Sequence, residues 1–427
     1  MLEMANIRAF RGLRYSPEVK LDSCICPPYD IISDSEREEL YRKSEYNIIR
    51  VEFGKEFEGD NAQNNKFTRA KEYLDEWIQR GILRFEDKES VYVLEQEFEI
   101  EGRKYRRTGL IVLLELVDFE EGIVIPHEFT LSKPKQERLN LLRHTHANIS
   151  SIFGLYEDKQ LNIKRILDDI KARKENVSYN GIGTFERIWI VSDNSIIENL
   201  KKLFADKKVF IADGHHRYET ALEYKKEMMQ KEDYSKDADY NYIMITLTAL
   251  EDEGIVILPT HRIVLSTDVE EDIFIERLKE NFDIEEGKYE PLKEKLAAYR
   301  KYAFLVYTYN RNYYLIKLKD PEKALKNVEG SKAYKNLDVV ILQKLVLNDV
   351  LNITDEDILH QRNLKYTKSD KELIDVVDSG AKYGFILNPT LAEELKEVSL
   401  SGEKMPQKST YFYPKLMTGN VIFVHQK

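Results

Sequence analysis

The sequence has little cysteine and lacks the common signatures of nucleotide-binding proteins and hydrolases. Its two cysteines, Cys24 and Cys26, are too few for a disulfide framework or a four-ligand zinc site. The phosphate-loop pattern G-x-x-x-x-G-K-[ST] and the dinucleotide fingerprint G-x-G-x-x-G are both absent, and so are H-E-x-x-H and G-x-S-x-G. If the protein handles nucleotides, it does so by an uncommon architecture.

Long apolar runs and an excess of positive charge are also missing. Residues 1–20 mix charges throughout, and no later run approaches the length needed to cross a membrane. With so little cysteine, this pattern predicts a cytoplasmic protein with no membrane partner. The net charge of -11 argues against a general nucleic-acid binder, because such proteins are usually basic over the binding domain.

Apolar periodicity predicts strands and helices in alternation, and therefore a mixed α/β fold. A hairpin is expected over residues 91–117, with its turn at Glu101 and Gly102 and an almost wholly apolar second arm that belongs in the centre of a sheet. Residues 46–53 are expected to form a strand, and residues 242–247 and 255–258 a strand pair.

Neither internal repeats nor low-complexity linkers mark domain boundaries. We expect four regions: an N-terminal α/β region, a core carrying the principal motifs, a charged α/β region, and a C-terminal segment returning to the active site. Their expected limits are residues 1–120, 121–265, 266–380 and 381–427.

The densest polar cluster follows the short apolar run 209–212 and precedes a helical pattern. It consists of Asp213, Gly214, His215, His216 and Arg217. A strand-to-helix turn presents N–H groups and the positive end of a helix dipole, and both attract anions. The histidines and the arginine add donors suited to phosphate, while the aspartate could orient a histidine or hold a divalent cation. The simpler alternative is that these residues only cap the helix.

A basic segment follows Pro126, His127 and Glu128. Glu128 and Glu137 are the only carboxylates from residue 126 to residue 146, and six basic residues there could meet an anion: Lys133, Lys135, Arg138, Arg143, His144 and His146. The alternative is an ordinary solvated basic helix over residues 132–145. Arg262, at the end of another expected strand, could join the same pocket.

The order of these motifs resembles a widespread bacterial and archaeal family labelled as a domain of unknown function. Its hallmarks look like residues 27–30 (Pro-Pro-Tyr-Asp), 126–128, 212–218 and 406–414. Two of them are similar to motifs of the ParB/sulfiredoxin-like free serine kinases, namely Pro-His-Glu and Asp-Gly-His-His-Arg. A third kinase motif, Pro-Lys-Thr-Thr-Arg, is matched in part by residues 408–410, with Tyr411 where an arginine is expected.

This resemblance implies a ParB/sulfiredoxin-like nucleotide-binding core with large insertions and a kinase acting on free L-serine to give O-phospho-L-serine. Glu128, beside His127, would be the base, and Asp213 to Arg217 would hold Mg²⁺ and the phosphates of ATP or ADP. The expected metal ligand is Asp213. Lys408, Ser409 and Thr410 would contact the substrate, with Arg262 or Arg143 compensating for Tyr411.

Two other classes share the central turn. A ParB-like regulatory protein would bind a nucleotide as a switch, without kinase activity. A sulfiredoxin-like reductase requires a cysteine within the turn, where this chain has His215.

Overall fold

The computed structural model describes residues 5–128, 132–231 and 235–426, without the side chains of residues 132–134. The chain divides into two units. Unit 1 comprises Met1–Pro126, Thr130–Val256 and Pro414–Lys427, and unit 2 comprises His127–Phe129 and Ile257–Tyr413. The four regions expected from the sequence stay a prediction. No helix in the described ranges is long and apolar enough to cross a membrane.

Unit 1 is built on a nine-stranded mixed sheet of order β6-β11-β8-β12-β5-β4-β10-β9, with β1 also paired to β5. The pairs β6–β11 and β8–β12 are parallel and the other pairs are antiparallel. Its strands are β1 (Ile7–Arg8), β4 (Val91–Ile100), β5 (Arg103–Glu115), β6 (Val124–Ile125), β8 (Ile152–Tyr156), β9 (Val177–Asn180), β10 (Thr184–Val191), β11 (Val209–Asp213) and β12 (Tyr242–Ala249). Two short sheets pair β2 (Leu13–Tyr15) with β3 (Leu83–Phe85), and β7 (Ala147–Asn148) with β21 (Phe423–Val424).

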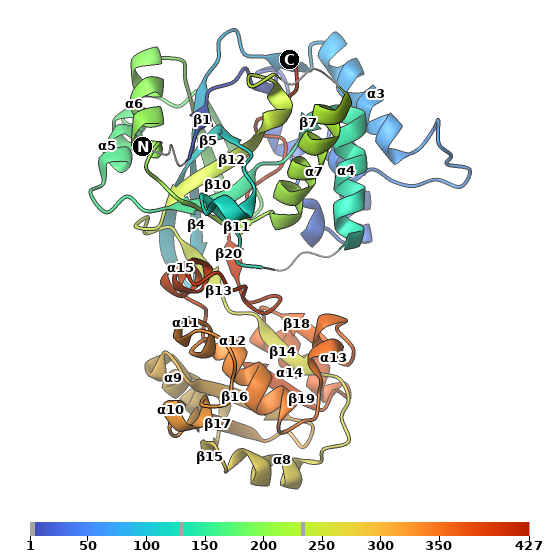
Figure 1. Cartoon of the computed structure of the whole chain (residues 1–427). Coiled ribbons are helices and arrows are strands. Elements are labelled where there is room, and N and C mark those ends of the chain that lie inside the picture. The colour runs from blue at the N-terminus through green and yellow to red at the C-terminus, as the bar shows by residue number, and fades with distance from the viewer. Residues whose placement is uncertain (1–4, 129–131, 232–234, 427) are drawn as a thin grey trace. The chain divides into compact units, whose positions relative to one another are not determined.

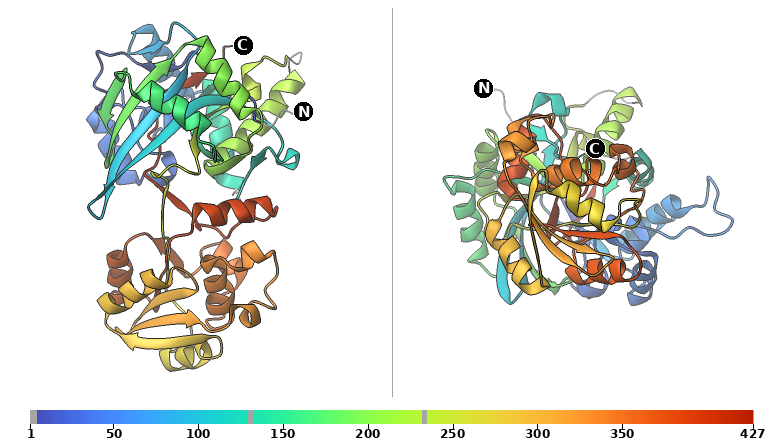
Figure 2. Two further views of the ribbon diagram at one scale, coloured as in Figure 1. Left: turned by 90° about the vertical axis from the view of Figure 1, so that its left-hand side faces the viewer. Right: turned by 90° about the horizontal axis from the view of Figure 1, so that it is seen from below.

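The long hairpin of β4 and β5 confirms the sequence prediction (Figure 2, left view). Its turn residues Glu101 and Gly102 have φ of 49° and 78°, as the mirror-image turns of hairpins require. Strand β5 lies between β4 and β12. Its side chains enter the cores on both faces, Leu110 and Val112 on one and Ile111 and Leu113 on the other, which explains its apolar composition.

Helices cover one face of this sheet and irregular chain covers the other. Apolar residues of α5 (Asn162–Lys171), α6 (Asn194–Phe204) and α7 (His215–Lys231) share one core with the sheet, and α5 and α6 lie side by side in Figure 1. The opposite core is closed by Phe10 and Ile25 together with Met417, Val421 and Phe423. A third core joins α1 (Asp34–Lys43), α2 (Ile49–Glu52) and α3 (Lys66–Gln79) to α4 (Ser132–Thr145).

Two expectations about strands are wrong. Residues 46–53 contain helix α2 (Ile49–Glu52) instead of a strand, and just before it the Asn47 side chain accepts a hydrogen bond from Ile49 N at 3.0 Å. Strand β12 does not pair with β13 (Val256–Leu258), since both its edges are occupied by β5 and β8. Strand β13 pairs instead with β20 (Tyr411–Tyr413).

Unit 2 contains a six-stranded antiparallel sheet of order β15-β17-β16-β19-β14-β18. Leucines of α9 (Tyr289–Tyr299) and α14 (Asp370–Asp378) pack on one face, and Phe274 of α8 (Glu271–Leu278) packs against Tyr383 on the other, with tilted rings whose centroids are 4.5 Å apart. Its strands are β14 (His261–Val264), β15 (Phe282–Gly287), β16 (Ala303–Thr308), β17 (Tyr313–Leu318), β18 (Leu364–Thr367) and β19 (Tyr383–Ile386); further helices are α10 (Pro321–Ala324), α11 (Lys332–Lys335), α12 (Asp338–Ile341), α13 (Asp355–Leu359) and α15 (Ala392–Leu400). Both units thus mix helices with sheets, as the sequence predicts.

Candidate functional site

The central turn joins β11 to α7 as the sequence predicts. Asp213 ends the strand, Gly214 has φ of 94°, and His215 begins the helix. The first intrahelical bonds run from the N–H groups of Arg217 and Tyr218 to the Gly214 carbonyl, at 2.9 and 3.1 Å. The N–H groups of His215 and His216 therefore come before the helical ladder, at the positive end of the helix dipole.

Asp213 lies between two cations. One carboxylate oxygen accepts from Lys415 Nζ at 2.5 Å and the other from Arg217 Nη2 at 3.0 Å. Burial by itself would raise the pKa of Asp213, but the charges of Lys415 and Arg217 outweigh burial and lower it to about 2. The turn is thus a cluster of fixed charges in which the cations outnumber the acid.

Hydrogen bonds from its first turn anchor helix α7 to neighbouring segments of unit 1. The buried Tyr218 hydroxyl donates to the Val117 carbonyl at 2.8 Å and accepts from the Val117 N–H at 3.1 Å. Arg217 Nη1 donates to the Ser151 carbonyl at 2.7 Å, which ties the first helical turn to the residue before β8. These bonds hold the N-terminus of α7 in place.

Lys415 is the site residue that the sequence analysis missed. Its backbone is held to the sheet by two buried side chains of the long hairpin: Arg107 Nη2 donates to the Pro414 carbonyl at 2.5 Å, and Gln96 Nε2 donates to the Lys415 carbonyl at 3.3 Å. The lysine stands 202 residues after Asp213. No local pattern indicates this contact.

Arg107 is a buried cation in the centre of the sheet face. Burial lowers its pKa to about 10, and nearby acids such as Glu186 oppose the shift. Its Nε donates to Gln96 Oε1 at 3.1 Å, and its guanidinium stacks on the Phe153 ring at 4.7 Å from the centroid. Gln96 in turn donates to Glu186 Oε1 at 2.9 Å. A satisfied polar network of this kind fixes geometry more rigidly than apolar packing alone.

The other predicted residues lie together in unit 2. His127 Nε2 is 3.0 Å from Thr410 Oγ1, and the His127 carbonyl accepts from the Met405 N–H at 2.8 Å. Glu128 Oε1 accepts from the Lys408 N–H at 3.4 Å. The Pro-His-Glu segment and the Lys-Ser-Thr loop, separated by about 280 residues in sequence, therefore meet in the fold.

Arg262 and Ser409 hold the shape of this loop. Arg262 is buried, and its guanidinium donates to the carbonyls of Thr260 and, at 3.4 Å, Lys408. Burial lowers the pKa of Arg262 to about 10. The Ser409 hydroxyl donates to the Pro406 carbonyl at 2.5 Å, and Lys408 takes a left-handed φ of 59°. The loop is a tight, internally bonded turn.

Helix α4 is not simply a solvated basic helix, because most of its basic side chains meet partners within unit 1. Lys135 pairs with Glu219 at 2.7 Å, and Arg143 pairs with Glu227. Arg138 is buried against Glu52, His144 Nδ1 lies 2.7 Å from the Asn140 carbonyl, and His146 Nδ1, just past the helix, lies 2.7 Å from the Tyr224 hydroxyl. The side chain of Lys133 lies outside the described residues.

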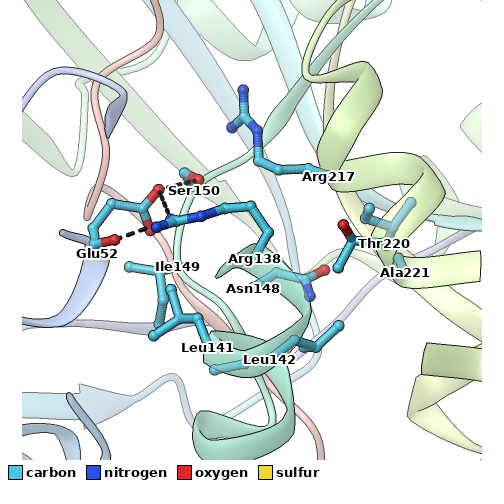
Figure 3. A pocket seen from close by; sticks show the side chains of 12 residues that line it. Glu52, Arg138, Leu141, Leu142, Asn148, Ile149, Ser150, Arg217, Thr220 and Ala221 are labelled. Carbon is cyan, nitrogen blue, oxygen red and sulfur yellow. Dashed lines mark hydrogen bonds and ion pairs between the residues drawn. The ribbon is translucent and has the colours of Figure 1, made fainter. Parts of the chain in front are cut away.

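A cavity of about 50 Å³ lies beside the turn, where Arg217 forms part of its wall (Figure 3). Glu52 of α2 and Arg138 of α4 form an ion pair at 3.2 Å along its edge, and Ser150 Oγ donates to Glu52 Oε1 at 3.0 Å. Thr220 and Ala221 of α7 close the side nearest the helix. The cavity thus borders on the first turns of α7.

A resident magnesium ion does not fit Asp213 as it is arranged here. Both carboxylate oxygens already accept from cations, and the described part of the chain holds no group of three or more His, Cys, Asp or Glu side chains that could bind a metal. Mg²⁺ typically binds to one or two carboxylates together with substrate phosphates. Asp213 as a metal ligand therefore stays a prediction that depends on a bound nucleotide.

The sheet and the cationic turn together define a mixed α/β protein with a charged strand-to-helix junction. The chain belongs to DUF1015, a family of proteins of unknown function whose model matches residues 7–340. This match confirms the resemblance to a domain-of-unknown-function family. No curated protein matches the chain.

Several solved structures are similar to the chain at low identity. A free serine kinase in complex with AMP is 15% identical, with a TM-score of 0.37 over 74% of this chain and 91% of that chain. A conserved hypothetical protein from Pyrococcus furiosus is 16% identical, with a TM-score of 0.35 over 72% and 92%. SbnI from Staphylococcus aureus, with a C-terminal truncation, is 8% identical, with a TM-score of 0.36 over 73% and 86%.

Proposed function

We propose that the chain is a small-molecule kinase that transfers a phosphoryl group from ATP or ADP to the hydroxyl of free L-serine. The observation that carries this proposal is the turn from Asp213 to Arg217, where a helix N-terminus, Arg217 and Lys415 gather positive charge at one point. Phosphoryl transfer needs such positioning and charge neutralisation more than it needs covalent participation by the protein.

The direction of the strands places Pro126 and Asp213 at one edge of the unit 1 sheet. Strands β6 and β11 are parallel neighbours with Ile125 opposite Phe210, so the chain leaves both at the same edge of the sheet. Pro126, the first residue of the Pro-His-Glu segment, directly follows β6, and Asp213 is the last residue of β11. This edge is where ligands commonly bind when neighbouring parallel strands end together.

In the proposed reaction, the serine hydroxyl oxygen bonds to the terminal phosphorus while the bond from that phosphorus to its bridging oxygen breaks. Glu128 takes the hydroxyl proton, and the nucleotide leaves as ADP from ATP or as AMP from ADP. His127, Lys408 and Thr410 act on the acceptor side, because their contacts hold the segment that carries Glu128, and Ser409 acts with them by holding the shape of their loop. Arg262 helps to position this loop by donating a hydrogen bond to the Lys408 carbonyl.

The direct test is incubation with Mg²⁺-ATP or Mg²⁺-ADP and a panel of hydroxy amino acids, with mass spectrometry of the products. We expect O-phospho-L-serine with one of the two nucleotides. Saturable nucleotide binding without any phosphorylated product would instead favour the ParB-like regulatory alternative. Absence of nucleotide binding would contradict both functions.

A further inference from the structure

The cavity between α2, α4 and α7 carries opposite charges on one wall. Glu52 and Arg138 are 2% and 7% exposed, and Arg217 lies nearby on α7 (Figure 3). The rest of the lining is mainly apolar, from Leu141, Leu142, Ala147, Ile149, Ala221 and Ile243. A few polar groups set in an apolar wall are typical of small-molecule sites.

The arginine has unused hydrogen-bonding capacity. Arg138 Nη1 donates to the Glu52 carbonyl at 2.9 Å and pairs with the Glu52 carboxylate, but its buried Nε has no acceptor among the described residues. The Tyr29 ring covers one face of the guanidinium, with the centroid 3.9 Å away. A fixed, desolvated donor of this kind is costly unless a ligand supplies the acceptor.

The acid on this wall, Glu52, is buried beside Arg138 and Arg217. Burial raises the pKa of Glu52 despite the nearby charges of Arg138 and Arg217 and the hydrogen bond from Ser150. A further positive charge in the cavity would stabilise the carboxylate. One wall therefore carries a buried donor without an acceptor at Arg138, next to the buried carboxylate of Glu52.

The size of the cavity restricts its occupant. About 50 Å³ accommodates roughly three to five water-sized groups, at about 10–15 Å³ each. That volume suits the head group of a small amino acid and is too small for a nucleotide. The apolar lining disfavours a long charged side chain.

We propose that this cavity binds the carboxylate and ammonium groups of a small amino acid, with Arg138 on the carboxylate and Glu52 on the ammonium. This inference rests on the proposed function, because it gives the acceptor of the kinase a binding site beside the phosphate turn. It also gives the Pro-Pro-Tyr-Asp hallmark a role, since Tyr29 of that segment fixes the arginine.

Ligand binding without nucleotide tests the proposal. Calorimetric titration would compare L-serine with 3-hydroxypropionate, which lacks the amino group, and ethanolamine, which lacks the carboxylate. We expect L-serine to bind at least tenfold more tightly than either analogue, since each leaves one buried charge unmatched. Equal affinity for all three compounds, or no binding of L-serine, would overturn the proposal.

Variants identify the residues involved. Arg138→Gln alone would leave Glu52 buried without its partner, so the double variant Glu52→Gln/Arg138→Gln removes both charges together. We expect it to lose tenfold or more in affinity for L-serine while keeping the thermal shift caused by nucleotide. Arg69→Gln, on the neighbouring helix α3 and paired with Asp60, is the control for loss of an ion-paired arginine and should bind L-serine normally.

These outcomes separate the two proposals. If nucleotide binds and serine is phosphorylated, but the double variant keeps wild-type affinity for serine, the cavity assignment is wrong and the kinase stands. If L-serine binds through Arg138 and Glu52 while no nucleotide binds, the kinase is wrong and the cavity assignment stands.

Discussion

At the scale of single residues, Asp213 contributes stability that depends on pH. Its pKa is lowered from 3.8 to about 2 by Lys415 and Arg217 against the effect of burial, and its side chain is 19% exposed. A group whose pKa is depressed in the folded state stabilises that state above its unfolded pKa and loses this effect as the pH falls through the folded pKa. The contribution is therefore present above pH 4 and disappears between about pH 4 and pH 2.

We expect Asp213→Asn to lower stability near neutral pH by on the order of 2 kcal/mol, from about 1.4 kcal/mol per unit of pKa shift. The difference in melting temperature between wild type and variant should shrink as the pH falls from 5 to 2. Asp206→Asn, at an exposed position, controls for loss of a carboxylate. A difference that stays constant over this range would contradict the charge assignment.

Glu128 is the residue on which the kinase chemistry depends. Glu128→Gln keeps an oxygen that can accept from the Lys408 N–H but removes the base. We expect turnover to fall by roughly 10²-fold or more with nucleotide affinity nearly unchanged. Glu137→Gln is the control. It removes the other carboxylate between residues 126 and 146, which pairs with Lys66, and it should keep most activity. Normal turnover in the Glu128 variant would remove this residue from the mechanism.

At the scale of elements, the strand-to-helix turn depends on the absence of a side chain at Gly214. A Cβ at this position would lie 3.0–3.1 Å from the Arg217 guanidinium, and the φ of 94° is strained for any other residue. We expect Gly214→Ala to cost about 1–3 kcal/mol of stability and to reduce nucleotide binding. Gly102→Ala has comparable strain in an open hairpin turn and should keep nucleotide binding. Thermal melts with and without Mg²⁺-nucleotide compare the two variants.

The long hairpin positions Lys415 through Arg107. In Arg107→Met, the buried acceptors on Gln96 and Pro414 lose their donor, at about 1–3 kcal/mol each. We expect a lower melting temperature and a smaller rise in melting temperature when nucleotide is added, because the segment carrying Lys415 is no longer fixed. Arg106→Met, the exposed neighbour on the same strand, should change neither quantity. If Arg107→Met showed the same rise in melting temperature with nucleotide as the wild type, Lys415 would not need the hydrogen bond from Arg107 to Pro414 for its position.

At the scale of the whole molecule, the net charge of -11 argues against general binding of nucleic acid. Charge neutralisation of phosphates drives non-specific binding to DNA, with typical dissociation constants of about 10⁻⁴–10⁻⁶ M at physiological salt. We expect fluorescence anisotropy to show no saturable binding of duplex DNA at micromolar protein, with or without nucleotide. Tight DNA binding that required nucleotide would favour the regulatory alternative.

The parts of this molecule that the sequence predicts are those governed by local interactions. The hairpin around Gly102 and the turn at Gly214 follow from residue spacing and from glycine conformations. The pairing of β13 with β20 and the contact of Lys415 with Asp213 join residues far apart in the chain. No pattern in the sequence around either residue predicts such contacts. Residues 46–53 resemble a strand by composition, but they contain helix α2, preceded by a hydrogen bond from Ile49 N to the Asn47 side chain.

The return of residues 414–427 to unit 1 has a consequence for how the protein is made. Met417, Val421 and Phe423 close one face of the large sheet, yet they leave the ribosome only after all of unit 2 has been synthesised. Domains generally fold as they emerge, with the N-terminal one first. Here unit 2 is complete while the sheet of unit 1 still exposes an apolar face, so a nascent chain stalled before residue 414 would be a substrate for chaperones.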